Sequence, residues 1–378
     1  MDKFRVLHVA SFSGNIGDNA NHTGFRESFD RHIGVEVEYT EFEIREVFWK
    51  RKKFDSSFVV LANSYDLVVI GGGNYFELWV DDSATGTSID IDLDLLKNIR
   101  TPIVFNALGV DPAQGAKDES VKKFRCFLDY AISSPTIILS CRNDGSIKAL
   151  REIVGEKYAD AFYHVPDSGL FTVVKNTYHP EIEPRKKNVV IQVAGDMLET
   201  RFPADASESI SADEFLNLMA RYIENINELD VNFIFVPHIF RDIGVISDLL
   251  NLLPDDIRRR NVAVAPYLVG QKGQDYIFDL YKKSDLVLGM RFHANVCGLG
   301  LGKTCIGLVN YRQIDELYNE LGLEEYKIQV NQKGFDKKLF DLSVKILNDS
   351  VFIKEDVLPF WREKLDMFHA DIARWLKS

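Results

Sequence analysis

The residue types best suited to chemistry stand close together in the stretch LGMRFHANVCGLGLGK, where Arg291 and His293 are two positions apart. An apolar run ends just before them and a run of small residues follows. Alternate side chains of an extended segment point the same way, so both would project from the end of one buried strand. Arginine presents a planar fork that matches carboxylate or phosphate, and neutral histidine can move a proton near neutral pH. We expect an anion site with an acid/base here; the alternative is a surface ion pair beside a structural histidine.

The same stretch predicts how the pair is positioned. We expect the strand to end near Met290 and a helix to begin near His293. The N-terminus of that helix would favour an anion beside the two side chains. Glycine inside a helix costs about 1 kcal/mol, so the glycines need a reason in packing or ligand binding. The residues that would let the helix approach the sheet closely are Ala294, Gly298, Gly300 and Gly302.

A second candidate loop, SFSGNIGDNANHTG, follows the first predicted strand and contains Asn15, Gly17 and Asp18. Glycines let a ligand come close to the backbone, and a helix beginning near Asn19 would offer N–H groups to an anion. The alternative is a tight turn in which Asp18 or Asn19 is simply the helix N-cap.

The third candidate, VVIGGGNYF, places Gly71, Gly72, Gly73 and Asn74 after a buried strand. Consecutive glycines can form a concave nest of N–H donors for a phosphate or carboxylate. Tyr75 is either a stacking platform for a sugar ring or a core residue.

The fourth candidate is the strand end SCRNDGS. Arg142 either clamps an anion or pairs with Asp144 or Glu152. In the nearby HVPDSGL, Asp167 is either a turn residue or a carboxylate beside the site.

Composition limits the classes of partner. The chain has 378 residues and a formal net charge of −12, which argues against a protein that coats nucleic acid or an anionic membrane, although a local basic cleft stays open. Four widely spaced cysteines favour the reducing cytoplasm over a disulfide framework. We see no signal peptide, and no apolar run approaches the roughly 20 residues of a membrane span.

The pattern along the chain predicts an α/β fold with two doubly wound, Rossmann-like domains. Ten apolar, β-branched runs alternate with helical patterns, five runs in each half. A proline-containing charged stretch separates the halves. The predicted parts are an N-terminal domain at 1–175, a linker at 176–187, a C-terminal domain at 188–350, and a C-terminal helix at 351–378 that packs across the junction.

The remaining histidines lack the paired spacing of a metal site, and we expect most of them at the surface or at helix caps. We therefore predict no metal site; we also expect no cofactor. These histidines are His8, His22, His32, His164, His179, His238 and His369.

Taken in order, these motifs resemble the polysaccharide pyruvyl transferase family. The resemblance runs from NIGDNA through YDLVVIGGGNYF, FNALGVDP, SCRNDGSIKAL and VPDSGL to LGMRFHANVCGLGLGKTCIGLVNY, and the Gly-Met-Arg-x-His block is its most specific part. The chain departs from the family pattern where Asn143 follows Arg142, with Asp144 one place later, and where Tyr311 and Arg312 lack the usual aspartate and lysine.

The resemblance implies two Rossmann-like domains facing a cleft, as in the glycosyltransferase-B architecture. It implies transfer of the pyruvyl group of phosphoenolpyruvate to two hydroxyls of a surface polysaccharide or its precursor, forming a cyclic ketal. Arg291 and His293 would act on the donor, which the C-terminal domain binds, and Asp18 or Asp167 would deprotonate the acceptor. The alternatives are a nucleotide-sugar glycosyltransferase of the same architecture and an inactive relative that binds glycan or phosphate.

Overall fold

The computed structural model describes residues 3–80, 82–203, 209–349 and 357–378. The chain divides by its contacts into two compact units. Unit 1 comprises Met1–Ser13, Asn21–Ser168 and Pro359–Ser378, and unit 2 comprises Gly14–Ala20 and Gly169–Leu358. The predicted boundary between residues 350 and 351 lies outside the described residues.

Unit 1 contains a parallel sheet in the order β2-β1-β3-β5-β7-β8. The inner strands β1, β3 and β5 are almost entirely buried, which explains why they read as continuous apolar runs, whereas the edge strand β2 alternates between apolar and polar residues. The order reverses direction between β1 and β3, and ligands of doubly wound sheets bind beyond the carboxyl ends of the strands at such a point. The strands are β1 Phe4–Ala10, β2 Val37–Glu43, β3 Leu67–Gly71, β5 Ile103–Leu108, β7 Ile137–Arg142 and β8 Tyr163–Val165, and β4 Phe76–Glu77 pairs with β6 Val110–Asp111.

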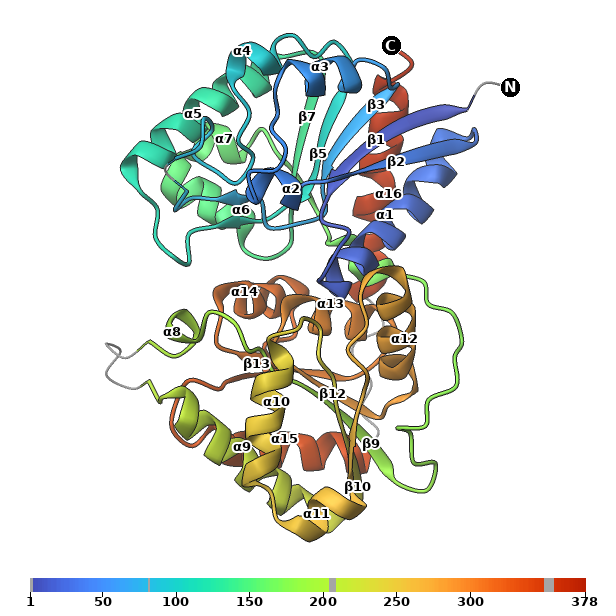
Figure 1. The fold of residues 1–378 in the computed structure, drawn as a ribbon, viewed down its shortest axis with the longest axis vertical. Coiled ribbons are helices and arrows are strands. Elements are labelled where there is room, and N and C mark those ends of the chain that lie inside the picture. The colour runs from blue at the N-terminus through green and yellow to red at the C-terminus, as the bar shows by residue number, and fades with distance from the viewer. Residues whose placement is uncertain (1–2, 81, 204–208, 350–356) are drawn as a thin grey trace. The chain divides into compact units, whose positions relative to one another are not determined.

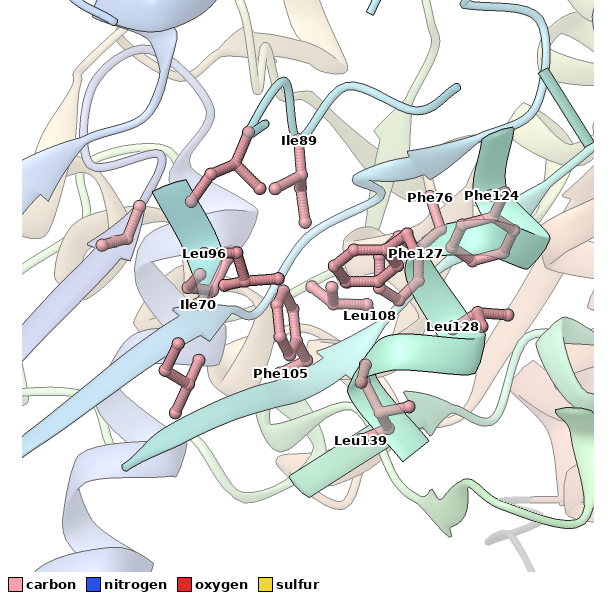
Figure 2. Packing of buried hydrophobic residues seen from close by; sticks show 14 of the residues in the cluster. Ile70, Phe76, Ile89, Leu96, Phe105, Leu108, Phe124, Phe127, Leu128 and Leu139 are labelled. Atoms are coloured by element: carbon pink, nitrogen blue, oxygen red, sulfur yellow. The ribbon is translucent and has the colours of Figure 1, made fainter. Parts of the chain in front are cut away.

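Helices cover the two faces of this sheet. On one face α1 and α16 lie side by side (Figure 1), joined by Phe25, Phe29, Phe368 and Ile372 in one buried cluster. The other face carries a larger core in which Phe76, Phe105, Phe124 and Phe127 pack together (Figure 2). The helices are α1 Ile16–Ile33, α2 Arg45–Phe48, α3 Ser56–Ala62, α4 Leu93–Leu96, α5 Asp118–Ser133, α6 Ser146–Ala149, the π-helical turn η1 Leu150–Val154, α7 Glu156–Ala159 and α16 Val357–Trp375.

Unit 2 repeats the plan with a parallel sheet in the order β11-β10-β9-β12-β13-β14, whose direction reverses between β9 and β12. The strands are β9 Lys187–Gln192, β10 Val231–Phe235, β11 Val262–Val264, β12 Leu286–Gly289, β13 Cys305–Val309 and β14 Lys327–Gln329. The helices are η2 Ser168–Phe171, α8 Leu198–Arg201, α9 Ala212–Ile226, η3 Asn227–Leu229, α10 Asp242–Leu252, α11 Asp255–Arg260, α12 Gly270–Lys283, α13 Phe292–Gly300, α14 Arg312–Leu321, η4 Glu324–Tyr326 and α15 Phe335–Asp349.

The predicted α/β class is confirmed, and each of the ten apolar runs contains a strand. The predicted start of the first helix is wrong. It begins at Ile16 rather than near Asn19, and Asn15 is the residue before it, whose side-chain oxygen accepts the Gly17 N–H at 3.0 Å. Asparagine is among the best N-caps, so the helix begins as soon as the chain reaches it.

The expected surface or capping position is wrong for five of the histidines. An imidazole is buried at lower cost when a ring nitrogen has a hydrogen-bond partner, as His179 Nε2 has in Asp279 Oδ2 at 2.8 Å. The buried histidines are His8, His22, His179, His238 and His369.

The stretch predicted as the linker contains no helix or strand between residues 176 and 186. It lies in unit 2, where Thr177 and His179 both bind Asp279 of α12. Among the described residues, no helix is both long enough and apolar enough to cross a bilayer.

Candidate functional site

The reversal point of the unit 2 sheet brings charged residues together from three strand ends. Asp196 follows β9, Asp242 begins α10 after β10, and Arg291 follows β12. Because the strands are parallel, these loops emerge at the same edge of the sheet. This edge is where a doubly wound domain binds its ligand.

Arg291 is held in a fixed orientation by two carboxylates. Its Nε donates to Asp242 Oδ2 at 2.9 Å, and its Nη2 donates to Asp196 Oδ1 at 2.8 Å and also to Asp242 Oδ1. Within the part of the chain that the structure describes, Nη1 has no hydrogen-bond partner, and the side chain keeps 10% exposure. One corner of the guanidinium is therefore left for a ligand oxygen.

Asp242 is the buried anchor of this arrangement. Its carboxylate accepts backbone N–H groups from Gly195 at 3.0 Å, His238 at 2.9 Å and Ile239 at 3.1 Å. Burial alone would raise the pKa of Asp242, but the hydrogen bonds and charge of Arg291 hold it below its usual value. Asp242 is therefore ionised at neutral pH and positions Arg291 rather than contacting a ligand itself.

A second arginine, which the sequence analysis missed, completes the cluster. Arg201 donates from Nη1 to Asn310 Oδ1 at 3.0 Å, and its Nη2 lies 3.5 Å from Asp196 Oδ1. Its guanidinium stacks over the Tyr311 ring at 5.3 Å. Burial, and then repulsion from Arg291, lower the pKa of Arg201, so an anion between the two arginines would relieve that repulsion.

The turn that carries Arg291 is fixed by Asn295 from within α13. The Asn295 amide donates to the carbonyl oxygens of Gly289 and Arg291, both at 2.9 Å, and accepts from the Tyr318 hydroxyl at 2.9 Å. A side chain at position 289 would collide with Asn295. The predicted strand-to-helix transition is confirmed, with β12 ending at Gly289 and α13 beginning at Phe292.

The glycines in and just after α13 are required for different reasons. A Cβ at Gly298 would lie 2.5 Å from Cys305 Sγ in β13, so close approach to the sheet is confirmed there. A Cβ at Gly300 would meet the Leu170 carbonyl at 2.2 Å. For Gly302 the packing prediction is wrong: it follows the helix, has φ +74°, and has nothing near its Cβ position, so it serves the turn.

His293, in the first turn of α13, lies against Asn15 and the first turn of α1, which belong to unit 2 and not to the predicted N-terminal domain. Its Nδ1 is 3.9 Å from Asp18 Oδ1, and Asn15 Nδ2 is 3.5 Å from the same oxygen. A Cβ at Gly17 would be only 2.4 Å from His293 Cβ, so only glycine admits the imidazole here. The structure thus brings together Asn15, Gly17, Asp18 and His293, which are far apart in sequence.

His238, which precedes α10, is a fully buried imidazole. Its Nε2 is 2.7 Å from the Tyr281 hydroxyl. Burial first, and then the positive charge of Arg291, lower the pKa of His238 to about 3. It is therefore neutral at working pH and adds no charge to the site.

In unit 1, Arg142 is enclosed by two carboxylates at the end of β7. Nε donates to Asp144 Oδ2 at 2.6 Å and Nη1 to Asp167 Oδ2 at 3.3 Å, with all three side chains at most 2% exposed. Asn143 Oδ1 accepts the Asp167 N–H at 2.9 Å. Arg142 therefore takes the pairing alternative with Asp144, and Asp167 joins it.

The glycine loop of unit 1 is tightly packed. The Gly72 N–H donates to the Asn106 carbonyl at 3.0 Å, so this donor of the predicted nest is already used. Gly71 and Gly72 have positive φ values of 143° and 80°, and a Cβ at Gly72 would strike Asn21. Gly73 packs against the Tyr75 ring.

Asn74 and Glu77 continue this loop. Asn74 Nδ2 donates to Asp111 Oδ2 at 2.9 Å, and a Cβ at Gly109 would meet both Asn74 and Arg142. Burial, with repulsion from Asp111, raises the pKa of Glu77 to about 7. The sequence analysis missed Glu77 because nothing in its local pattern distinguishes it from a surface carboxylate.

Among the described residues, no group of three or more histidine, cysteine, aspartate or glutamate side chains is arranged to hold an ion. The acidic side chains described at the two sheet edges face an arginine, a histidine, an amide, a hydroxyl or a backbone N–H.

Comparison with solved structures identifies the fold. A glycosyltransferase from Rickettsia africae ESF-5 aligns with a TM-score of 0.54 at 10% identity, over 100% of both chains. A Listeria monocytogenes protein described as a UDP-N-acetylglucosamine 2-epimerase aligns with a TM-score of 0.50 at 11% identity, over 97% of this chain and 91% of the other. The protein therefore has two Rossmann-like domains of the glycosyltransferase-B type.

Comparison of sequences identifies the family. The search among curated proteins found no significant match. The sequence profile of the family described as polysaccharide pyruvyl transferase matches residues 15–311, a range that contains Asn15, Arg142, Arg291 and His293. This range is well over half of the 378 residues. The chain belongs to the polysaccharide pyruvyl transferase family.

Proposed function

We propose that the protein transfers the pyruvyl group of phosphoenolpyruvate to two hydroxyls of a saccharide and forms a cyclic ketal. The observation that carries the proposal is the state of Arg291. Two carboxylates fix its Nε and Nη2, whereas Nη1 has no partner among the described residues and is left for a ligand. His293 lies two positions later, at the start of α13. Family membership supports a transferase that acts on polysaccharide.

The donor is assigned to the sheet edge of unit 2. Phosphoenolpyruvate carries a carboxylate and a phosphate, and Arg291 Nη1 with the start of α13 would bind one of these groups. We assign the other anionic group of the donor to Arg201 rather than to Arg142, because Arg142 is enclosed by Asp144 and Asp167. The sheet-edge residues of unit 1 are assigned to the acceptor saccharide.

His293 is assigned as the acid that protonates the donor. A proton delivered to the methylene carbon leaves an oxocarbenium-like carbon, which one sugar hydroxyl attacks. Phosphate then leaves, and the second hydroxyl attacks the same carbon to close the ketal. The two hydroxyl protons end on the new methyl group, by way of His293, and on the phosphate. Asp18, whose Oδ1 lies 3.9 Å from His293 Nδ1, is assigned to orient the imidazole.

The identity of the donor is tested by thermal unfolding. Wild-type protein is heated alone and with phosphoenolpyruvate, inorganic phosphate, pyruvate, uridine diphosphate or guanosine diphosphate. A ligand that binds only the folded state raises the melting temperature, so phosphoenolpyruvate is expected to give the largest rise. A rise with a nucleotide and none with phosphoenolpyruvate would replace the proposal with the nucleotide-sugar glycosyltransferase.

An inactive glycan- or phosphate-binding relative remains a second outcome. It would show a melting response without phosphate release from phosphoenolpyruvate across a panel of saccharides.

We also propose a cytoplasmic location, because Cys126, Cys141, Cys297 and Cys305 are all free thiols, as expected in a reducing compartment.

A further inference from the structure

The segment Phe48–Lys53 of unit 1, FWKRKK, exposes aromatic and basic side chains together. It runs from the end of α2 toward Phe54, which returns to the core. Phe48 is 70% exposed and Trp49 is 45% exposed. Large apolar side chains of a soluble domain are normally scattered singly, so two adjacent ones beside four cations need an explanation.

The charge of this segment contrasts with that of the chain. Four consecutive basic residues occur in a protein of net charge −12. Lys50 lies 3.7 Å from Asp82, and Arg51 lies 3.6 Å from Glu46. Lys52 and Lys53 have no ion-pair partner among the residues that the structure describes, so the segment keeps a local positive charge.

The basic and aromatic side chains are near one another in space. The Arg51 guanidinium lies over the Trp49 ring at 4.9 Å, and the Lys52 ammonium lies over the Phe42 ring at 4.9 Å. All four cations line a hollow of about 620 Å³ between β2 and α3.

The acidic side chains of the hollow are already engaged. Glu41 pairs with Arg26 at 2.9 Å, and Asp55 accepts the Ser57 and Phe58 N–H groups as the cap of α3. Four cations line the hollow against these two carboxylates, of which Glu41 is already paired with Arg26, so the lining keeps a net positive charge. Thr40 and Ser57 add hydroxyls to its wall.

We propose that Phe48–Lys53 docks unit 1 on the surface of an anionic phospholipid bilayer. Tryptophan and phenylalanine enter the headgroup region, and clustered lysine and arginine are attracted to anionic lipids. The hollow lined by Lys50–Lys53 receives a lipid phosphate, and Phe48 and Trp49 insert beside it. This is peripheral attachment and needs no spanning helix.

This inference does not depend on the proposed reaction, since it concerns an exposed segment of unit 1 and no substrate. It also refines the argument from total charge. The net charge of −12 opposes binding of the whole surface, but electrostatic attraction falls off within about 8–10 Å in physiological salt, so a local patch decides the contact.

The test is co-sedimentation of the full chain with vesicles, either of pure phosphatidylcholine or with a third of it replaced by phosphatidylglycerol. Wild type is expected to bind the anionic vesicles and to dissociate at high salt. Each cation near such a surface strengthens binding by about fivefold, so Lys52→Glu with Lys53→Glu is expected to weaken it at least tenfold. The control is Lys337→Glu with Lys338→Glu, an equal charge change at exposed lysines of α15.

Fluorescence supplies the second readout. Trp49 emission is expected to shift to shorter wavelength on anionic vesicles, and Trp49→Phe should remove the shift while retaining most of the binding. Circular dichroism checks that each variant is folded. The proposal is overturned if wild type does not bind anionic vesicles at low salt, if the α15 variant loses as much binding as the Lys52 and Lys53 variant, or if soluble glycerol phosphate at millimolar concentration abolishes binding.

Discussion

The two sheet edges use the same residue types in opposite ways. In unit 1, Arg142 is at most 2% exposed and lies between two carboxylates that are as buried as it is. In unit 2, Arg291 also lies between two carboxylates, but Asp196 is 22% exposed and one corner of the guanidinium has no partner among the described residues. An arginine at a strand end is therefore structural when its fork is closed, and fit for ligand binding when part of the fork remains open.

The difference originates in how each carboxylate is itself held. Asp242, the first residue of α10, is fixed by three backbone N–H groups, so it positions Arg291 without covering it. Asp144, two residues after Arg142, and Asp167, which follows β8, both accept from the Arg142 guanidinium and enclose it. A buried pair of this kind is costly to break because each partner is then left as an uncompensated charge.

The largest effect is expected at the open edge. His293→Gln keeps a polar side chain of similar size but cannot supply the proton, so turnover should fall by about a thousandfold, equal to about 4 kcal/mol. Phosphate release from phosphoenolpyruvate with an acceptor measures it, and the affinity for phosphoenolpyruvate should change little. Near-normal turnover would remove His293 from the acid role.

Substitution of Arg142 at the sheet edge of unit 1 should instead lower the free energy of unfolding. Arg142→Ala leaves Asp144 and Asp167 buried without their cation, at a cost of about 3 kcal/mol or more. Hydrogen exchange, read peptide by peptide, should show lost protection around β7 and little change in unit 2. Unchanged protection at β7 would show that Arg142 does not stabilise unit 1.

The packing of His293 on the N-terminal loop can be disturbed without touching either charge. Gly17→Ala places a methyl group where the imidazole now lies, since the Cβ would be 2.4 Å from His293 Cβ. Displacement of a catalytic group by about 1 Å costs up to a hundredfold, so we expect about a thirtyfold loss of turnover. Gly14→Ala, whose Cβ position is open but whose φ of +96° is strained, controls for strain in the loop. Equal losses in both variants would contradict a specific contact.

The smallest effect concerns pH. The pKa of His238 is lowered to about 3 in the folded state, so the unfolded state takes up its proton at higher pH. This contribution to stability is full above about pH 6.5 and is lost as the pH falls toward 3; at pH 5.5 the loss is about 1.4 kcal/mol. In His238→Gln, the free energy of unfolding of unit 2 should fall less between pH 8 and pH 5.5 than in wild type, by that amount. Hydrogen exchange in unit 2 measures it. A fall identical to that of wild type would show that His238 is already protonated when folded.

The sequence predicted those features that depend on local pattern. Buried strands are continuous apolar runs, and the transition from β12 to α13 is marked by Gly289 and Arg291, so both were found. The short strands β8, YHV, and β14, KIQ, were missed because they contain polar residues and do not lie in apolar runs, unlike the equally short β11.

What the sequence did not reveal depends on contacts between distant segments. Asp196, Arg201 and Asp242 join Arg291 only because parallel strands end at one edge. The enclosure of Arg142 requires Asp167, 25 positions away, and no local signal separates a closed arginine from an open one. The contact of Gly17 with His293 spans most of the chain, so the glycine was noted while its reason was not.

The most direct test of the central claim is a calorimetric titration of phosphoenolpyruvate into wild type, Arg291→Lys and Arg258→Lys. Lysine keeps the charge at position 291 but loses the fork, and Arg258, which pairs with Asp255 on α11, provides the matched control. We predict saturable binding to wild type and to Arg258→Lys, with affinity reduced at least tenfold in Arg291→Lys. Equal affinity in all three proteins, or no binding to wild type, would contradict the assignment of the donor site to Arg291.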